Sequence, residues 1–147
     1  MTSSAKRAAT SCTTPIPALR FRVGRSAIHA RGLFSVTGVP RRMKLGELTG
    51  VLKPLPQARQ MMQRRAVIHL VELSQRWALD CSRGNHFRHL NHSCQANCYL
   101  RVIRRRVEIY SRASITAGSE LTVDYRETQH PGGMTCRCGA PGCRSLL

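Results

Sequence analysis

The sequence is poor in acidic residues and in aromatic residues. It holds 7 Asp and Glu against 24 Lys and Arg, which gives a formal net charge of +17, and no acidic residue precedes Glu47. Such an excess attracts nucleic acid, ribosomes or acidic proteins through counterion release and electrostatic steering; a solubilising basic surface is the alternative interpretation. Aromatic residues make up 5% and hydrophobic residues 41%. This composition excludes a disordered chain and predicts a core of Leu, Val, Ile, Met and Ala.

Long hydrophobic runs are also absent. No segment approaches the roughly 20 apolar residues that a helix needs to cross a bilayer, and the N-terminus lacks the apolar stretch of a signal peptide. We therefore expect a protein that is neither embedded in a membrane nor secreted, cytoplasmic if bacterial and nuclear or chromosomal if eukaryotic. The length of 147 residues suits one domain. Residues 1–18, rich in Ser, Thr and Ala near their start, are expected to form a disordered tail rather than a transit peptide.

The pattern of apolar residues predicts a mainly β fold with little helix. Short apolar or β-branched runs predict strands at six positions: 19–23, 33–36, 43–48, 99–103, 107–111 and 121–125. Two of these runs flank three consecutive arginines, Arg104 to Arg106, which predicts a hairpin with a basic tip. The stretch 57–79 combines a helical stripe with β-branched residues, and we expect a helix followed by a strand.

Seven cysteines are a high and odd number for a chain without a secretion signal. Metal binding or free thiols are therefore expected rather than a disulfide framework. Three of them fall within eight residues, separated by small and turn-forming residues: Cys136, Cys138 and Cys143. Zinc accepts thiolates readily and wants four tetrahedral ligands, so the fourth must come from elsewhere in the chain. The candidates are Cys94, which we favour, Cys98 and His92.

Residues 84–98 form a second unusual segment, dense in amide and imidazole side chains and poor in aliphatic ones. Asn91 offers hydrogen-bond donors and an acceptor together. A segment of this kind indicates either a ligand site or a polar surface loop.

Five segments of the chain resemble, in the same order, the motifs of the SET domain family. Residues 88–98 (RHLNHSCQANC) resemble the signature R-F-x-N-H-S-C-x-P-N-C, and residues 119–125 (SELTVDY) resemble its partner G-E-E-L-T-x-D-Y. Residues 26–34 (SAIHARGLF) resemble S-x-I-H-G-x-G-L-F, residues 46–50 resemble G-E-x-x-G, and residues 136–146 resemble the post-SET zinc tail. The ordered set is far more specific than any one motif.

The resemblance implies a fold, a division of the chain and an activity. The expected fold is a SET domain of small β-sheets with a knot-like core over residues 19–126, followed by a zinc-bound, cysteine-rich post-SET segment over residues 127–147. The expected activity is transfer of methyl groups from S-adenosylmethionine to a lysine side chain of a histone or of another basic or nucleic-acid-associated protein.

Site residues follow from the same resemblance, motif by motif. Tyr125 would be the catalytic residue. The cofactor would contact eight residues: Ala30, Arg31, Gly32, Leu33, Arg88, Asn91, His92 and Tyr125. A structural zinc ion would be held by Cys94, Cys136, Cys138 and Cys143.

Two departures from the family pattern carry expectations of their own. Ala30 stands where the family often has glycine, which permits positive φ and a close backbone approach, so we expect an altered cofactor loop or weaker cofactor binding. Val123 stands where an aromatic residue often controls the number of methyl groups added, and the smaller side chain favours multiple methylation. The alternative function is a catalytically weak SET scaffold that binds nucleic acid or ribosomes through basic clusters such as Arg104 to Arg106.

Overall fold

The computed structural model describes residues 18–65, 67, 69–125 and 134–147. Apart from residue 18, the expected disordered tail lies outside these residues, and so does the expected boundary between residues 126 and 127. Within the described part of the chain, no helix is both long and apolar enough to span a membrane. The described residues form three small sheets and one α-helix, so the mainly β prediction is confirmed.

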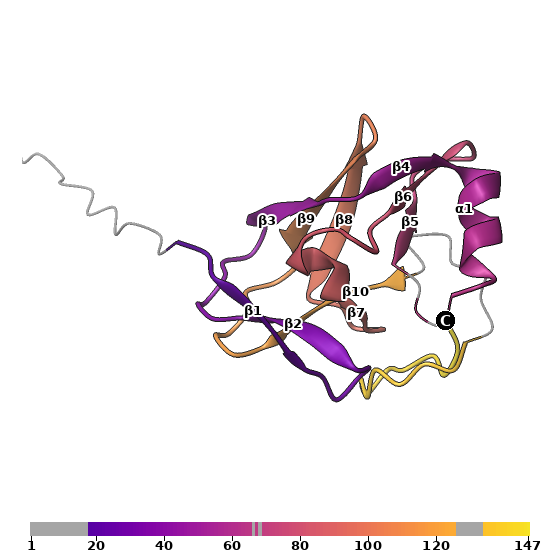
Figure 1. Ribbon diagram of the computed structural model, residues 1–147. Helices are drawn as coiled ribbons and strands as arrows, with labels where there is room; N and C mark the ends of the chain where they lie inside the picture. Colours follow the sequence, from indigo (N-terminus) through magenta and orange to yellow (C-terminus); the bar gives the residue numbers. More distant parts are fainter. Residues whose placement is uncertain (1–17, 66, 68, 126–133) are drawn as a thin grey trace, which may run out of the picture.

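The first sheet brings the N-terminal hairpin together with strands from late in the chain. Its order is β1 (Phe21–Arg25), β2 (Arg31–Ser35), β10 (Glu120–Val123) and β7 (Asn91–His92). Strand β10 pairs antiparallel with β2 and parallel with β7. Two segments about 30 residues apart in sequence therefore run side by side in the same direction (Figure 1).

The second sheet contains the predicted hairpin. Its order is β3 (Lys44–Leu48), β9 (Arg106–Ser111) and β8 (Cys98–Ile103). Arg104 and Arg105 form the turn with φ of 46° and 67°. Positive φ at both central residues is typical of the tight turns that match the twist of a hairpin, so the basic tip is confirmed.

The third sheet and the helix form the part of the fold that the pattern over 57–79 predicted only in outline. The helix α1 (Leu55–Met62) does come first, but two strands follow it, β5 (Leu70–Glu72) and β6 (Trp77–Asp80), and β6 pairs with both β5 and β4 (Val51–Pro54). Arg59 of the helix donates two hydrogen bonds to the Glu72 carboxylate, at 2.8 and 2.9 Å, and so ties α1 to β5.

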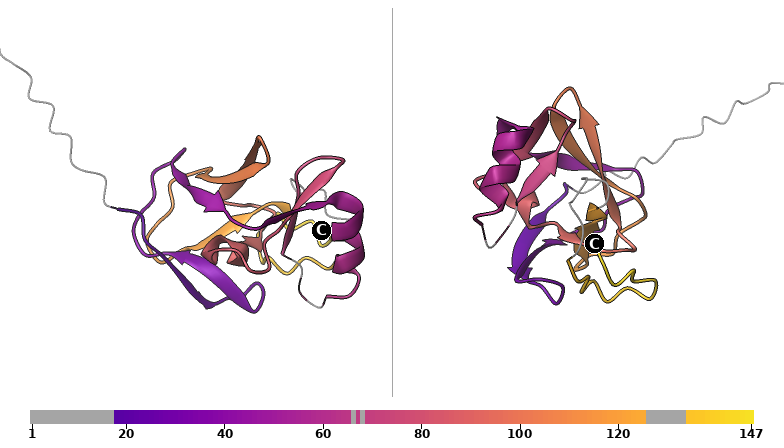
Figure 2. Two further views of the ribbon diagram at one scale, coloured as in Figure 1. Left: turned by 45° about the horizontal axis from the view of Figure 1, so that its top comes forward. Right: turned by 90° about the vertical axis from the view of Figure 1, so that its right-hand side faces the viewer.

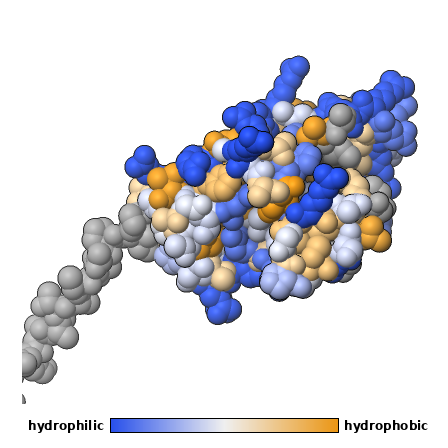
Figure 3. All heavy atoms as spheres, turned by 90° about the horizontal axis from the view of Figure 1, so that it is seen from below, coloured by the Kyte–Doolittle hydropathy of each residue, from blue (hydrophilic) through white to orange (hydrophobic). Residues whose placement is uncertain are grey.

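The core lies where the sheets face one another. Five of its side chains have no exposed surface at all, and they come from β2, β8, β9 and β10: Leu33, Cys98, Val107, Ile109 and Leu121. Figures 1 and 2 show α1 and its sheet at one end of the molecule and the β1–β2 hairpin toward the other, with β10 and β7 between them. On the face seen from below, many hydrophilic residues lie along the upper edge, whereas the lower right part is pale to orange, so polarity is not spread evenly (Figure 3).

Candidate functional site

The two central motifs meet because β7 and β10 are parallel neighbours. Thr122 pairs with Asn91 and Val123 with His92, and the next residue, Ser93, donates its N–H to the Val123 carbonyl at 3.1 Å. Parallel strands bring the residues that follow them to the same edge of the sheet. The segment after His92 and the segment after Val123 therefore begin next to each other, at the same edge of the first sheet.

Tyr125 is held at this edge by both its backbone and its side chain. Its N–H donates to Nδ1 of His92 at 3.1 Å, and its hydroxyl donates to the carbonyl of Leu90 at 3.0 Å. Burial raises the pKa of Tyr125 to about 12, and the negative charge of Glu120 adds to the rise. The hydroxyl therefore stays protonated at neutral pH, where it can orient a reacting group but cannot act as an anionic base.

Asn91 connects β7 to the loop between β1 and β2. Its side chain is 6% exposed, and its Nδ2 lies 3.1 Å from Ser26 Oγ, 3.2 Å from the His29 carbonyl and 3.1 Å from the Arg31 carbonyl. Glu120 Oε1 lies still closer, at 2.8 Å. An amide nitrogen has two hydrogens, so these four acceptors share them. Asn91 thereby fixes the loop that carries the expected cofactor contacts.

Glu120 and Ser26 complete this network, although the sequence did not mark them as site residues. Ser26 Oγ donates to the Glu120 carboxylate at 2.8 Å. A Cβ atom built on Gly32 would lie 2.1 Å from Glu120 Oε1, so only glycine at position 32 leaves room for the carboxylate. Both residues do fall within matched motifs, at the start of residues 26–34 and within residues 119–125, and that position was the available signal.

The remaining expected cofactor residues differ in how they are placed. Ala30 has φ of 36°, in the region that favours glycine, as the departure from the family pattern suggested. Arg31 is exposed, whereas the Leu33 side chain is fully buried in the core, which leaves only the Leu33 backbone for a ligand. Arg88, in the 3-10 helix η1 (His86–His89), donates from Nη1 to the Gly84 carbonyl at 2.9 Å.

A cluster of metal-ligating side chains lies beside Tyr125. One ligand atom from each of four residues lies within 4.8 Å of the other three: His92, Cys94, Cys136 and Cys138. The Sγ atoms of Cys94 and Cys136 are 3.7 Å apart. Two thiolates on one tetrahedral zinc, each about 2.3 Å from the metal, are separated by about 3.8 Å. The spacing of this donor pair fits zinc.

The other two cysteines of the C-terminal motif belong to the same neighbourhood. Burial would raise the pKa of Cys138, but hydrogen bonds from the backbone N–H groups of Cys94 and Ala140, together with the thiols of Cys136 and Cys143, lower it to about 6. A thiol with this pKa is a thiolate at neutral pH, which is the form that binds a metal. The Cys143 thiol also contacts Cys136 and accepts a hydrogen bond from the Ser145 N–H at 3.5 Å.

Cys98 occupies a different environment from the clustered cysteines. It is fully buried in β8, and burial raises its pKa to about 12. Among the described residues it is not part of the group of mutually close ligand atoms. Its surroundings favour a neutral thiol inside the core.

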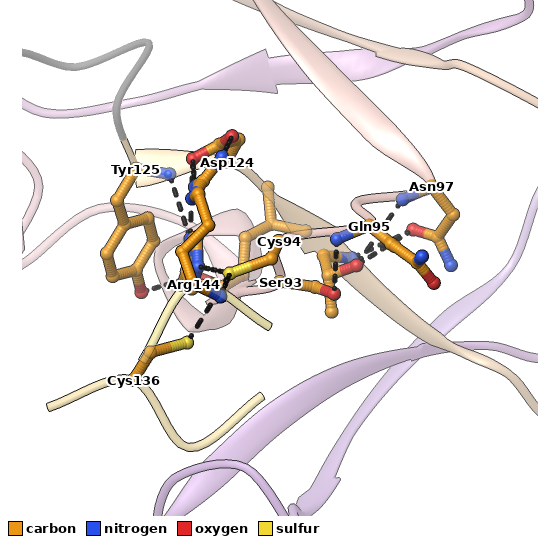
Figure 4. A network of polar contacts seen from close by, with 11 residues as sticks. Ser93, Cys94, Gln95, Asn97, Asp124, Tyr125, Cys136 and Arg144 are labelled. Atoms are coloured by element: carbon orange, nitrogen blue, oxygen red, sulfur yellow. Dashed lines mark hydrogen bonds and ion pairs between the residues drawn. The ribbon is translucent and has the colours of Figure 1, made fainter. Parts of the chain in front are cut away.

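Arg144 joins the C-terminal tail to Asp124, the residue between β10 and Tyr125. Its guanidinium donates to both carboxylate oxygens of Asp124, at 2.9 and 2.7 Å, and its backbone N–H donates to Cys94 Sγ at 3.3 Å (Figure 4). Asp124 also lies 3.7 Å from Nδ1 of His92. The cysteine cluster, His92 and Tyr125 therefore form one connected structure.

Comparison of the sequence with known proteins identifies relatives of this chain. Residues 30–126 match the family described as the SET domain. The chain is 33% identical over 136 residues to "Histone-lysine N-methyltransferase set-2" of Caenorhabditis elegans, with 86% of this chain and 9% of that protein aligned. It is 33% identical over 134 residues to "Histone-lysine N-methyltransferase, H3 lysine-4 specific" of Schizosaccharomyces pombe, with 84% and 15% aligned. For "Histone-lysine N-methyltransferase SETD1A" of Homo sapiens the identity is 28% over 138 residues, with 87% and 8% aligned. The chain thus spans only a small part of the length of these relatives.

Proposed function

The chain belongs to the SET domain family, and on that premise we propose that it transfers methyl groups from S-adenosylmethionine to lysine side chains of a protein. The observation that carries the proposal is the meeting of Asn91, His92 and Tyr125 at the paired ends of β7 and β10. These relatives are named as histone-lysine N-methyltransferases, and the one from Schizosaccharomyces pombe is named as specific for H3 lysine 4. We therefore propose a histone as the substrate.

The loop before β2 suits the amino acid part of the cofactor. The carbonyl oxygens of His29 and Arg31 lie within 3.2 Å of the Asn91 amide, so acceptors and an amide gather in one place. Such a group can accept hydrogen bonds from an ammonium group. We propose that the cofactor contacts are those expected from the motifs: Ala30, Arg31, Gly32, Leu33, Arg88, Asn91, His92 and Tyr125. When bound, S-adenosylmethionine supplies a methyl group activated by a positively charged sulfur.

The protein's own task is to present a neutral amine in line with that methyl group. A free lysine has a pKa near 10.4, so only about one in a few thousand is neutral at pH 7. The amine would first lose its proton to solvent, and its lone pair could then accept the methyl group that the cofactor would supply, with the electron pair of the former C–S bond left on sulfur. Tyr125, protonated because its pKa is raised to about 12, supplies a neutral hydroxyl that orients the amine. Positioning of this kind accounts for much of the rate in bimolecular reactions.

We propose that the structural zinc is bound by Cys94, Cys136, Cys138 and Cys143. His92 is the competing ligand, but its Nδ1 accepts the N–H of Tyr125. In a neutral imidazole the proton is then on Nε2, which lies 3.3 Å from Cys94 Sγ and can donate to it. This arrangement makes His92 a hydrogen-bond partner of a zinc ligand, and it leaves Cys143 as the fourth ligand. On this basis residues 19–126 are the SET domain and residues 127–147 the post-SET segment.

The proposal extends to the number of methyl groups added and to the location of the protein, and it bears on the alternative function. Val123, 3% exposed, is smaller than the aromatic residue often found there, which supports the addition of more than one methyl group. The relatives named for histone methylation come from eukaryotes, which supports the nuclear alternative for location. The alternative of a catalytically weak scaffold is not favoured.

The experiment that tests the proposal is methyl transfer from labelled S-adenosylmethionine to histone octamers and to nucleosomes, with mass spectrometry to identify the modified lysine. Calorimetric titration with the cofactor is run in parallel. Labelled lysine together with measurable cofactor binding supports the proposal. DNA binding without cofactor binding would instead support the scaffold alternative.

A further inference from the structure

Beyond methyl transfer, we propose that the solvent face of the β3–β9–β8 sheet binds the phosphate backbone of duplex DNA. This basic face consists of six basic side chains from the sheet and from the turn that precedes β3: Arg41, Arg42, Lys44, Arg101, Arg106 and Arg112. All six residues are exposed.

The turn before β3 is fastened to the end of β9. The backbone N–H of Arg42 donates to the Ser111 carbonyl at 3.0 Å, and Nε of Arg41 donates to the Arg112 carbonyl at 3.2 Å. Arg42 adopts φ of 61°, a left-handed conformation that reverses the chain at this point. These contacts place two arginines of the turn next to Arg112.

An open groove of about 380 Å³ results at this place. Its lining comes from the turn, from β8 and from the residue after β9: Arg41, Arg42, Tyr99, Leu100 and Arg112. Three of these five residues carry guanidinium groups. Guanidinium groups pair with phosphate oxygens in a bidentate manner and lose less hydration than ammonium groups. The groove therefore suits an anionic chain rather than an apolar ligand.

The acidic residues of the basic face do not cancel its charge. Lys44 Nζ lies 2.6 Å from Glu108 and 2.8 Å from Glu47, and Arg106 lies 3.5 and 3.2 Å from the same two carboxylates. The face thus holds six basic side chains against two acidic ones, a net charge of +4. The two acids are placed against Lys44 and Arg106, away from the turn arginines that line the groove.

The aromatic residues of the basic face indicate backbone contacts with a duplex rather than base stacking with a single strand. The rings of Tyr99 and Tyr110 stack on each other with centroids 5.6 Å apart and 19° between their planes. The Arg112 guanidinium lies 5.6 Å from the centroid of the Tyr99 ring. Proteins that bind single strands without sequence preference stack bases on aromatic faces. Here the Tyr99 ring already contacts Tyr110 and Arg112, which leaves phosphate contacts as the main mode of binding.

Duplex DNA would also explain how so basic a chain approaches a basic substrate. If the proposed histone substrate is right, a net charge of +17 repels a basic histone tail. Contact with nucleosomal DNA would offset this repulsion. The DNA-binding proposal itself does not require methyl transfer and can be tested without cofactor.

The test measures binding of the full chain to a short fluorescent DNA duplex of arbitrary sequence by anisotropy, over a series of salt concentrations. The variant Arg41→Gln/Arg42→Gln/Arg101→Gln removes three charges from the basic face. The control variant Arg25→Gln/Arg64→Gln/Arg83→Gln removes three exposed charges from other parts of the chain. Equal thermal unfolding midpoints in the three proteins establish that folding is retained.

We expect the first variant to lower the slope of log K against log salt by about 2 to 3 and to raise Kd at least about tenfold, because each lost phosphate contact removes about 0.9 from the slope. The control variant should stay close to the parent. Equal weakening by both variants would overturn the proposal, because the binding would then follow net charge alone. Tighter binding of a single strand would also overturn it. So would binding of polyglutamate, but not DNA, through the same three arginines.

Discussion

Arg144 donates two hydrogen bonds to the Asp124 carboxylate, at 2.9 and 2.7 Å, and Asp124 immediately precedes Tyr125. Arg144 also donates its backbone N–H to Cys94 Sγ. The C-terminal tail therefore reaches the proposed catalytic tyrosine through one charge-assisted pair as well as through the metal cluster. Binding of a metal by the cysteines would then order the residues around Tyr125.

Arg144→Lys tests this connection. A lysine ammonium keeps the positive charge but cannot reproduce two parallel hydrogen bonds to one carboxylate. We expect the zinc dissociation constant, measured by competition with a chromophoric chelator, to rise about tenfold, as is common when partners of metal ligands are lost. Arg137→Lys, in the same tail and exposed, is the matched control. Equal zinc affinity of the two variants would show that the Asp124 pair does not support the cluster.

Gly32→Ala tests the contact between β2 and Glu120. The added Cβ would lie 2.1 Å from Glu120 Oε1 and would push the carboxylate away from Ser26 and Asn91. Overpacking of this kind lowers the free energy of unfolding by about 2 kcal/mol. At Gly38 the nearest atom to an added Cβ is 3.9 Å away, so Gly38→Ala serves as the control in the same urea titration. If both variants unfold at the same urea concentration, Glu120 does not need the space at position 32.

Ala30→Gly tests the strained loop. Ala30 has φ of 36°, and a residue with a Cβ in the left-handed region loses about 1 kcal/mol or more relative to glycine there. We expect the variant to unfold at a higher urea concentration and to bind S-adenosylmethionine more tightly in calorimetry. Ala27→Gly, three residues earlier in the same loop, should be neutral or destabilising because glycine gains more freedom on unfolding. A gain at both positions would count against strain at Ala30.

The buried thiols predict a loss of stability at alkaline pH. Burial raises the pKa of Cys81 and of Cys98 from 9.0 to about 12, with the charge of Asp80 adding to the rise at Cys81. Their neutral forms are favoured in the folded state, so this contribution is complete below pH 9 and is lost as the pH rises from 9 toward 12. At pH 10.5 the stability lost in this way amounts to about 2 kcal/mol for each thiol.

Cys81→Ala checks this expectation, because it removes one of the two thiols. Urea unfolding at pH 7.5 and at pH 10.5 should show a smaller alkaline loss for the variant than for the parent, by about 2 kcal/mol. The small cost of removing a sulfur atom is common to both pH values and cancels in the comparison. An identical alkaline loss in the two proteins would mean that the Cys81 thiol ionises as freely in the folded state as in the unfolded chain.

Local pattern predicted the elements whose pairing partners are close in sequence. The alternation on both sides of Arg104 to Arg106 placed the β8–β9 hairpin, because a hairpin needs no distant information. The strand Val51–Pro54 was not predicted, since Lys53 and Pro54 weaken its β pattern. Its existence depends on pairing with Trp77–Asp80, a segment that follows the helix in the sequence.

The same distinction holds for the candidate site. Asn91, His92 and Tyr125 could be proposed as site residues because their motifs are local runs of sequence. Ser26 and Glu120 were missed as partners because they are 94 residues apart, and nothing in either segment announces the contact. Nothing in the sequence distinguishes Arg144 from the other basic residue of the tail, because its partner Asp124 lies in a different segment.

The most direct test of the account is methyl transfer by Tyr125→Phe. The substitution removes the hydroxyl that contacts the Leu90 carbonyl while keeping the ring beside His92. We predict that the rate of methylation of a histone lysine, followed by mass spectrometry, falls about a hundredfold or more through lost positioning, while calorimetry still shows cofactor binding. Tyr110→Phe, which loses a hydroxyl bound to Glu108, should keep the parent rate. Unchanged methylation by Tyr125→Phe would contradict the role assigned to this residue.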